Sequence, residues 1–337
     1  MSSMLLNKDK WPDFVGKLSG KVWVPQEEDG EFISFAPLSG DVEKLPVFYN
    51  TRVPPKKIVF PQTETLYRFQ VDDYEMTAPP VEEKTAIIGI RPCDARAMKI
   101  IDNLFGWDVD DPYYLQRREL VTLVGLACSS PGHNCFCTSV GGGPASTEGL
   151  DVIMFDLEDS YLLEAVTDRG EALLKESGDL LEKAGQEALA HKEKLIAAAE
   201  EKISRSVDVE GMPEGLPGLW DDPLWQRVSA PCLGCGTCTY LCPTCHCFDI
   251  QDETEGFAAR RYRTWDSCMF EEYTSHTSGH NPRPTRRERT RNRINHKYSY
   301  YVDKFDLIAC VGCGRCINYC PVNIDIVEIL RQVKEAL

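Results

Sequence analysis

The stretch "CLGCGTCTYLCPTCHCF", residues 232–248, places six cysteines between positions 232 and 247. Its first four follow the spacing C-x2-C-x2-C-x3-C and precede Pro243, and "CVGCGRCINYCP", residues 310–321, repeats this spacing. Such a run is the bacterial ferredoxin signature, in which the fourth cysteine binds the other cluster. Three thiolates on a tight turn can cap three irons of one cube, and the intervening glycines let the backbone come close.

The doubled run therefore predicts two [4Fe–4S] clusters whose ligands cross between the runs. The expected ligands of the first cluster are Cys232, Cys235, Cys238 and Cys320. The expected ligands of the second cluster are Cys310, Cys313, Cys316 and Cys242. The alternative is a pair of structural zinc sites, although zinc favours two C-x2-C pairs separated by a spacer. The long separation between the runs favours a helical dicluster domain with an insertion over a compact small ferredoxin.

A competing pattern overlaps the first run. Cys238, Cys242 and Cys245 spell C-x3-C-x2-C, which resembles the radical-SAM signature. That class of enzyme needs a strand–helix barrel after the motif, and the sequence does not predict one.

The composition is that of a soluble globular protein made of two domains. The chain has 337 residues and a net charge of −16, which argues against nucleic acid or an anionic membrane as the main partner. No apolar run is long enough to span a bilayer, and the first residues break into charge after two leucines, unlike a secretory signal. We therefore expect a cytoplasmic protein whose 15 cysteines bind metal rather than form disulfides.

Buried strands are predicted at 85–90, 120–128 and 151–157, with a helix after the first. This βαβ-like pattern indicates a mixed or parallel sheet. Residues 158–206 are rich in Ala, Glu, Leu and Lys at amphipathic spacing, which predicts a helical segment.

The predicted fold is mixed α+β. After a Gly- and Pro-rich junction at 211–223, long strand signals end and a cysteine-rich sequence with helical segments follows. We expect an α/β sheet domain over 1–215. A mainly helical, ferredoxin-like dicluster domain should follow over 216–337.

Four more cysteines converge on one edge of the predicted sheet. Cys93 follows the strand at 85–90 and Cys128 ends the strand at 120–128, so both should lie at the carboxyl edge if these strands are parallel neighbours. A Gly/Pro loop then brings Cys135 and Cys137. We interpret these thiols as a third [4Fe–4S] site, with zinc or unligated thiols as the alternatives. His133 is expected at the surface or beside the ligands.

The stretch "RPTRRERTRNRINHK", residues 283–297, is strongly basic in an acidic chain. It is predicted to be an insertion between the cluster motifs, either solvated or serving to dock an acidic partner subunit, with nucleic acid a distant third.

The strings "IRPCDARAMKIID", "CFCTSVGGGP", "CLGCGTCTYLCPTCHCFDI", "WDSC" and "CVGCGRCINYCP" together resemble one iron–sulfur protein family. This family includes the sulfhydrogenase β subunit as well as the A component of anaerobic sulfite reductase, and the resemblance runs from about Lys21 to Ile326. It implies a non-catalytic protein that passes electrons between two other subunits, one that binds flavin and NAD(P) and one that is catalytic. It also implies that the sheet-domain cysteines carry an extra cluster.

Three cysteines remain unassigned, namely Cys245, Cys247 and Cys268. With His246 or Asp266 they could hold another metal. The preferred interpretation is that they pack beside a cluster and influence its potential.

The sequence contains neither a dinucleotide fingerprint nor an obvious acid–base constellation. These observations favour an electron-transfer subunit of a cytoplasmic, hetero-oligomeric oxidoreductase complex of anaerobic metabolism. Catalytic subunits of the hydrogenase, sulfite reductase and heterodisulfide-reductase-like kinds remain open. The alternative is a zinc-stabilised interaction module without a redox role.

Overall fold

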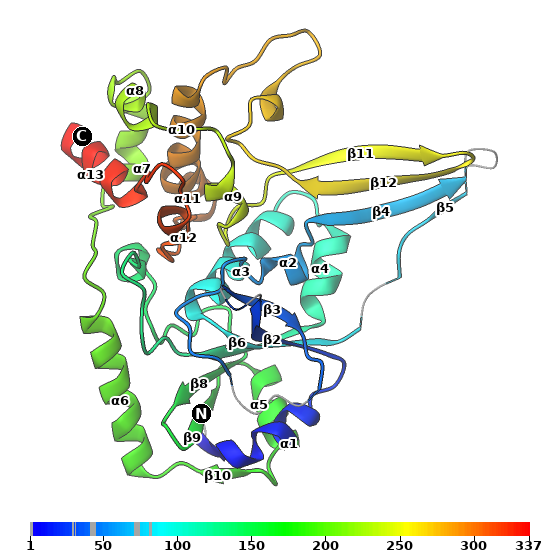
Figure 1. The fold of residues 1–337 in the computed structure, drawn as a ribbon, viewed down its shortest axis with the longest axis vertical. Coiled ribbons are helices and arrows are strands. Elements are labelled where there is room, and N and C mark those ends of the chain that lie inside the picture. The colour runs from blue at the N-terminus through cyan, green and yellow to red at the C-terminus, as the bar shows by residue number, and fades with distance from the viewer. Residues whose placement is uncertain (1–2, 29, 31, 41–44, 71–74, 81–82) are drawn as a thin grey trace.

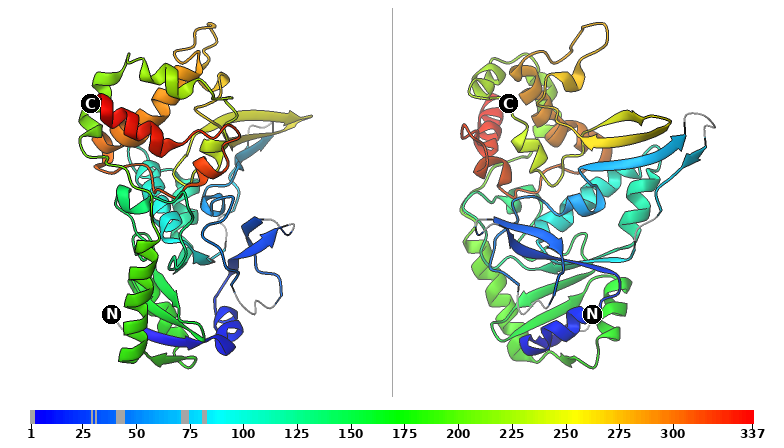
Figure 2. Two further views of the ribbon diagram at one scale, coloured as in Figure 1. Left: turned by 60° about the vertical axis from the view of Figure 1, so that its left-hand side comes forward. Right: turned by 45° about the vertical axis from the view of Figure 1, so that its right-hand side comes forward.

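The computed structural model describes residues 3–28, 30, 32–40, 45–70, 75–80 and 83–337. Its larger sheet lies at one end of the elongated molecule and the helices that follow residue 211 lie at the other (Figure 1). Two further views show the same division, with the long helix α6 (Gln186–Glu201) running along one side (Figure 2).

The larger sheet has eight strands in the order β10-β1-β9-β8-β7-β6-β2-β3. The strands are β1 (Ser3–Asn7), β2 (Lys21–Glu28), β3 (Phe32–Pro37), β6 (Thr85–Ile90), β7 (Val121–Leu126), β8 (Val152–Asp156), β9 (Ser160–Ala165) and β10 (Leu181–Lys183). The central pairs β2–β6, β6–β7 and β7–β8 are parallel, and the outer pairs are antiparallel. The three strands predicted from continuous apolar runs are confirmed.

Apolar side chains cover both faces of the central strands. Ile88 and Val124 belong to one core cluster, whereas Ile87 and Leu123 belong to another. This follows from the period-two alternation of side chains along a strand. The second cluster includes the buried face of α3 (Pro92–Phe105), which begins directly after β6.

The segment 158–206, predicted to be helical, contains two strands as well as two helices. The helices are α5 (Asp168–Glu176) and α6, and the strands are β9 and β10. The prediction is wrong for β9 because Glu158, at φ 73°, turns the chain back so that β9 pairs with β8. Pairing and burial in the sheet outweigh the local helix propensity of its Leu and Glu residues.

A smaller sheet joins the two halves of the sequence. It has the order β11-β12-β4-β5 and is antiparallel throughout. Its strands are β4 (Thr63–Gln70), β5 (Met76–Thr77), β11 (Phe248–Glu255) and β12 (Ala258–Trp265). The sequence prediction missed this hairpin, which extends from the body beside β4 (Figure 1). The sheet therefore crosses the expected domain boundary at 215.

The region beyond residue 211 is otherwise mainly helical, in agreement with the predicted fold class. Its α-helices are α7 (Met212–Gly215), α8 (Leu224–Ser229), α9 (Thr237–Tyr240), α10 (Arg286–Asn295), α11 (Tyr301–Phe305), α12 (Arg315–Asn318) and α13 (Ile326–Ala336). A π-helical turn (His296–Tyr300) continues α10. Trp225, Ile294 and Leu330 are fully buried in one core that these helices share. Over the described ranges, no helix has both the length and the apolarity needed to cross a bilayer.

Candidate metal centres

The first cysteine run is a tight turn leading into α9. Gly234 and Gly236 both have positive φ, 72° and 74°, which glycine adopts without a steric penalty. A Cβ at Gly236 would lie 2.7 Å from the ring of Phe270, so the turn also has no room for a side chain there. The backbone N–H of Gly234 donates to Cys232 Sγ at 3.4 Å. Hydrogen bonds of this kind stabilise a thiolate.

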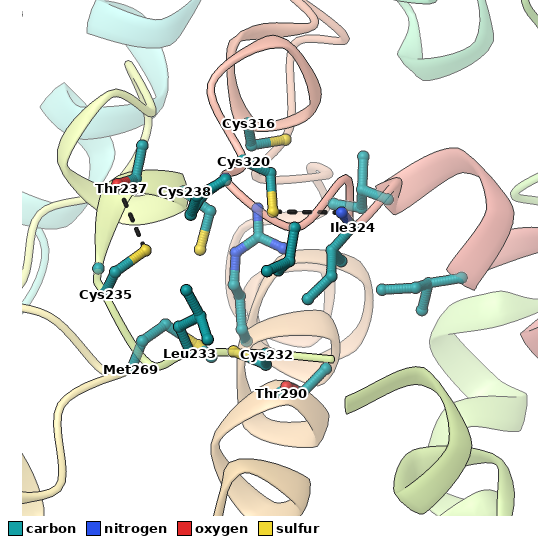
Figure 3. A pocket seen from close by; sticks show the side chains of 16 residues that line it. Cys232, Leu233, Cys235, Thr237, Cys238, Met269, Thr290, Cys316, Cys320 and Ile324 are labelled. Atoms are coloured by element: carbon teal, nitrogen blue, oxygen red, sulfur yellow. Dashed lines mark hydrogen bonds between the residues drawn. The ribbon is translucent and has the colours of Figure 1, made fainter. Parts of the chain in front are cut away.

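The expected ligands of the first cluster line one space between α9, α10 and the chain after α12. These are Cys232, Cys235, Cys238 and Cys320. Figure 3 shows Cys235, Cys238 and Cys320 with their side chains directed toward the middle of this space. The backbone N–H of Ile324 donates to Cys320 Sγ at 3.2 Å, and much of the remaining lining is apolar.

The expected ligands of the second cluster line a neighbouring space. These are Cys242, Cys310, Cys313 and Cys316. The second run repeats the local geometry of the first, with Gly312 and Gly314 at φ 63° and 76° and α12 starting directly after Gly314. Cys316 lines both spaces, so the two groups of thiols are adjacent. The structure thus brings together both crossed quartets that the spacing predicts.

The sheet-domain thiols lie near one another at the carboxyl edge of the larger sheet. β6 and β7 are parallel neighbours, as expected, so Cys93 in the first turn of α3 and Cys128 after β7 share this edge. Burial raises the pKa of Cys135 to about 12, and the neighbouring Cys313 and Cys128 add to this effect. Burial likewise raises the pKa of Cys137 to about 11, with Cys128 again contributing. Without a cation these groups would hold their protons.

The loop that carries Cys135 and Cys137 packs directly on the second cysteine run. The backbone N–H of Phe136 donates to the carbonyl oxygen of Gly312 at 2.9 Å, and Cys135 Sγ lies 3.8 Å from the carbonyl oxygen of Cys313. A Cβ at Gly312 would lie 2.5 Å from the backbone nitrogen of Cys137. The contact therefore depends on a glycine at position 312.

The three unassigned cysteines lie beside the first two groups of thiols. The thiol of Cys245 interacts with that of Cys242, and the thiol of Cys268 interacts with that of Cys247. Cys268 is buried and packs with Cys232. This placement agrees with the interpretation that the three pack beside a cluster, and their role stays a prediction.

The polar neighbours suggested for these three cysteines have other contacts. The Nδ1 atom of His246 lies 3.0 Å from the carbonyl oxygen of Thr244, and burial lowers the pKa of His246 to about 3. Asp266 accepts a hydrogen bond from the backbone of Ser267 at 2.6 Å. Across the described part of the chain, no three Cys, His, Asp or Glu side chains gather closely enough for a single ion.

The radical-SAM pattern does not gather in one place. Cys238 lines the first space, whereas Cys242 lines the second and Cys245 lies beside Cys242. His133 is exposed, as expected. The glycine-rich turn at 141–144 packs beside Cys128, because the backbone N–H of Cys128 donates to the carbonyl oxygen of Pro144 at 2.8 Å.

The basic stretch 283–297 is exposed or half-buried up to residue 288 and mostly buried from Arg289 onward, which corrects the expectation of a solvated or docking insertion for its second half. It forms α10, which begins with a capping box between Thr285 and Glu288. The buried cations on it are Arg289, Arg291, Arg293 and Lys297. The Nζ atom of Lys297 lies 3.4 Å from Cys242 Sγ and donates to Thr244 and Ala309 at 2.9 Å each. Part of the positive charge therefore faces thiols rather than solvent.

The donor set fits iron–sulfur chemistry. Each space joins three thiols from one tight turn with a fourth from the other run, amid apolar side chains. Arg293 lines both spaces, and its Nε and Nη2 atoms have no hydrogen-bond partner in the protein. Buried N–H groups without partners are rare in proteins and point to an acceptor that binds there.

Comparison with known proteins places the chain in the class of iron–sulfur proteins with a 4Fe-4S dicluster domain, whose family model matches residues 231–324. The chain is also 31% identical over 344 residues to sulfhydrogenase 2 subunit beta of Pyrococcus furiosus, and the match covers 100% of each chain. It therefore belongs to the family of iron–sulfur electron-transfer subunits that includes the sulfhydrogenase β subunit, which confirms the resemblance seen in the sequence. No solved structure matches the chain significantly.

Proposed function

We propose that this chain is a non-catalytic relay that passes electrons between two other subunits, one that binds flavin and NAD(P) and one that is catalytic. Bound [4Fe–4S] clusters supply one-electron transfer, which needs no acid–base set from the protein. The chain's own residues hold the clusters by thiolates, exclude water with apolar side chains and place cations beside the sulfur atoms. The ligands proposed for the first two clusters are the crossed quartets described above, and those for a third are Cys93, Cys128, Cys135 and Cys137.

The observation that carries this proposal is the contiguity of the three groups of thiols. Cys316 lines both the first and the second space, and Cys135 lies against the backbone of Cys313 in the second run. Electron transfer needs centres that are close together and held rigidly, and contiguous ligand groups satisfy this requirement. Isolated structural metal sites would not need to adjoin one another.

The outer groups lie close to the protein surface. Cys235 of the first group is exposed, and its neighbour Leu233 is 57% exposed. At the other end, Ser129 and Ser130 are exposed directly after Cys128. We expect one of the two other subunits to contact the protein beside the first group of thiols and the other to contact it beside the third group.

The relative is by name a subunit of a sulfhydrogenase, which supports a hetero-oligomeric assembly for this chain as well. A hydrogenase, sulfite reductase or heterodisulfide-reductase-like subunit is the proposed catalytic partner, in the cytoplasm of an anaerobically growing cell. No nucleic-acid partner and no membrane insertion are proposed. Anaerobic purification of the tagged chain from its own host, followed by identification of co-purified subunits, tests this arrangement. Purification of the chain alone under gentle conditions would contradict it.

Metal and acid-labile sulfide content, together with EPR of the reduced protein, tests the cluster assignment. Three cubane clusters predict about twelve iron and as many sulfide per chain. About eight iron with one zinc would retain the first two clusters and make the sheet-domain site structural. A colourless chain with zinc and no iron would exclude the electron-transfer function and support the zinc-stabilised interaction module.

A further inference from the structure

Arg293 occupies a position that no other cation on α10 shares. Its side chain lines the first space together with Cys232 and Cys238, and it also lines the second space together with Cys242 and Cys313. Its charge interacts with thiols of both groups, among them those of Cys238 and Cys316. The residue is 6% exposed, so solvent screens its charge little.

The hydrogen bonds of the neighbouring arginines show how Arg293 differs. Arg291, also 6% exposed, stacks on the Trp220 ring at 3.6 Å and donates to the carbonyl oxygen of Trp220 at 2.8 Å. Arg289 donates to the carbonyl oxygens of Arg283 and Pro284. Arg289 and Arg291 each have one buried nitrogen, Nε, without a partner in the protein, whereas Arg293 has two, Nε and Nη2. Leaving such charged donors unpaired in the interior is costly, so they are expected to meet an anionic acceptor.

Lys297 provides a useful contrast one turn further along the chain. Its ammonium has three N–H donors, and it lies within hydrogen-bond distance of Cys242 Sγ, Thr244 Oγ1 and the carbonyl oxygen of Ala309. It lines the second space and is not among the residues around the first. Lys297 therefore serves one group of thiols, whereas the guanidinium fork of Arg293, with donors in several directions, can serve two.

We propose that Arg293 is a shared counter-charge of the first two clusters, donating hydrogen bonds to the sulfur atoms of both and setting both reduction potentials. This inference rests on the proposed iron–sulfur function and goes beyond it by assigning an electrostatic role to one residue. Hydrogen bonds and positive charge at the sulfurs favour the reduced, more negative state of a cluster, so they raise its potential. A single shared residue therefore raises both potentials together.

The test is an EPR-monitored redox titration of the anaerobically purified, full-length chain, with iron content measured on the same samples. Arg293→Met should move the midpoint potentials of both clusters to more negative values. Lys297→Met should move only that of the cluster bound by Cys242. Arg291→Met, a matched control on the same helix, should leave both unchanged. A shift of one midpoint only, or of neither, in Arg293→Met overturns the proposal.

Iron content separates this inference from the proposed function. If the wild-type chain binds no iron, the proposed function fails. If the wild type holds its iron and Arg293→Met leaves the potentials unchanged, only the shared counter-charge fails. If Arg293→Met loses about eight of about twelve iron and keeps the rest, both clusters depend on Arg293, whereas loss of about four overturns sharing. Arg293→Lys, which keeps a charge but loses the fork, should retain the iron and still shift both potentials.

Discussion

Arg315 donates two hydrogen bonds to Asp94, at 2.7 and 2.8 Å, and both side chains are almost completely buried. Arg315 lies between Cys313 and Cys316 of the second run, and Asp94 follows Cys93 at the start of α3. Arg315 also donates to the carbonyl oxygen of Thr51 at 2.7 Å. The pair thus fastens the second group of thiols to the third, and it contributes to their fixed spacing.

Asp94→Asn should destabilise the protein strongly, because it leaves the buried Arg315 guanidinium without its counter-charge. Breaking a buried ion pair on one side costs about 3–5 kcal/mol of unfolding free energy. Denaturant unfolding under anaerobic conditions measures this loss. Asp208→Asn, which breaks an exposed pair with Lys334, is the control and should have little measurable effect.

The double variant Asp94→Asn/Arg315→Met should recover part of that stability, because it removes both charges from the interior. A double variant that is less stable than Asp94→Asn alone would mean that Arg315 acts mainly through Thr51.

Gly312→Ala should separate the loop at 134–137 from the second cysteine run. The new Cβ would lie 2.5 Å from the backbone nitrogen of Cys137, and a backbone contact cannot give way as a flexible side chain can. We expect a lower melting temperature and loss of the third cluster's iron, about four atoms per chain.

Gly211→Ala is the matched control for this substitution. Gly211 has a similar positive φ of 70°, but a Cβ there would meet nothing within 4 Å. The Gly211→Ala variant should therefore lose only about 1 kcal/mol of unfolding free energy, from the backbone strain of an alanine in the left-handed region. Equal effects of the two substitutions on iron content would show that the contact with Cys137 is unimportant.

Cys320→Ser should remove the cluster bound by the first run, although Cys320 belongs to the second. Its thiol lines the space of Cys232, Cys235 and Cys238. Iron should fall from about twelve to about eight per chain, and Cys242→Ser should remove the other dicluster signal from the EPR spectrum. Cys268→Ser should keep all the iron, since that thiol is interpreted as a neighbour rather than a ligand; loss of about four iron would identify it as a ligand.

The cysteine quartets were predictable because their geometry is local. Each run fixes three thiols on one turn, and only Cys242 and Cys320 needed a pairing rule from outside the run. The strands β6, β7 and β8 could be predicted equally well, because strands covered on both faces have continuous apolar sequences.

The elements that the sequence did not predict depend on distant contacts. β12 pairs with β4, which lies almost 200 residues earlier in the chain. The local sequence of β12 does not indicate which strand it pairs with. The burial of Arg293 and Lys297 follows from thiols that are remote in sequence, whereas a basic helix is ordinarily a surface feature. One local signal was present in the sequence: Ile294 and Tyr298 are four residues apart, the spacing of side chains on one helix face. Both are fully buried in the structure.

Acid should weaken the fold through His296, one of the partly buried histidines of the helical region. Burial lowers the pKa of His296 to about 4, and the nearby Lys297 and Arg283 act in the same direction. Above about pH 6.5 the imidazole is neutral in both the folded and the unfolded chain. Between about pH 6.5 and 4 the unfolded chain binds a proton that the folded chain does not, so stability falls as the pH falls.

This linkage predicts a loss of about 2 kcal/mol of unfolding free energy at pH 5 relative to pH 7 from His296 alone. Cluster ligands also respond to acid, so the comparison must be made between the wild type and His296→Gln at each pH. The difference in unfolding free energy between the two proteins should move in favour of the variant as the pH falls from 7 to 5. A difference that stays constant over this range would show that His296 takes up its proton as readily in the folded chain as in the unfolded one.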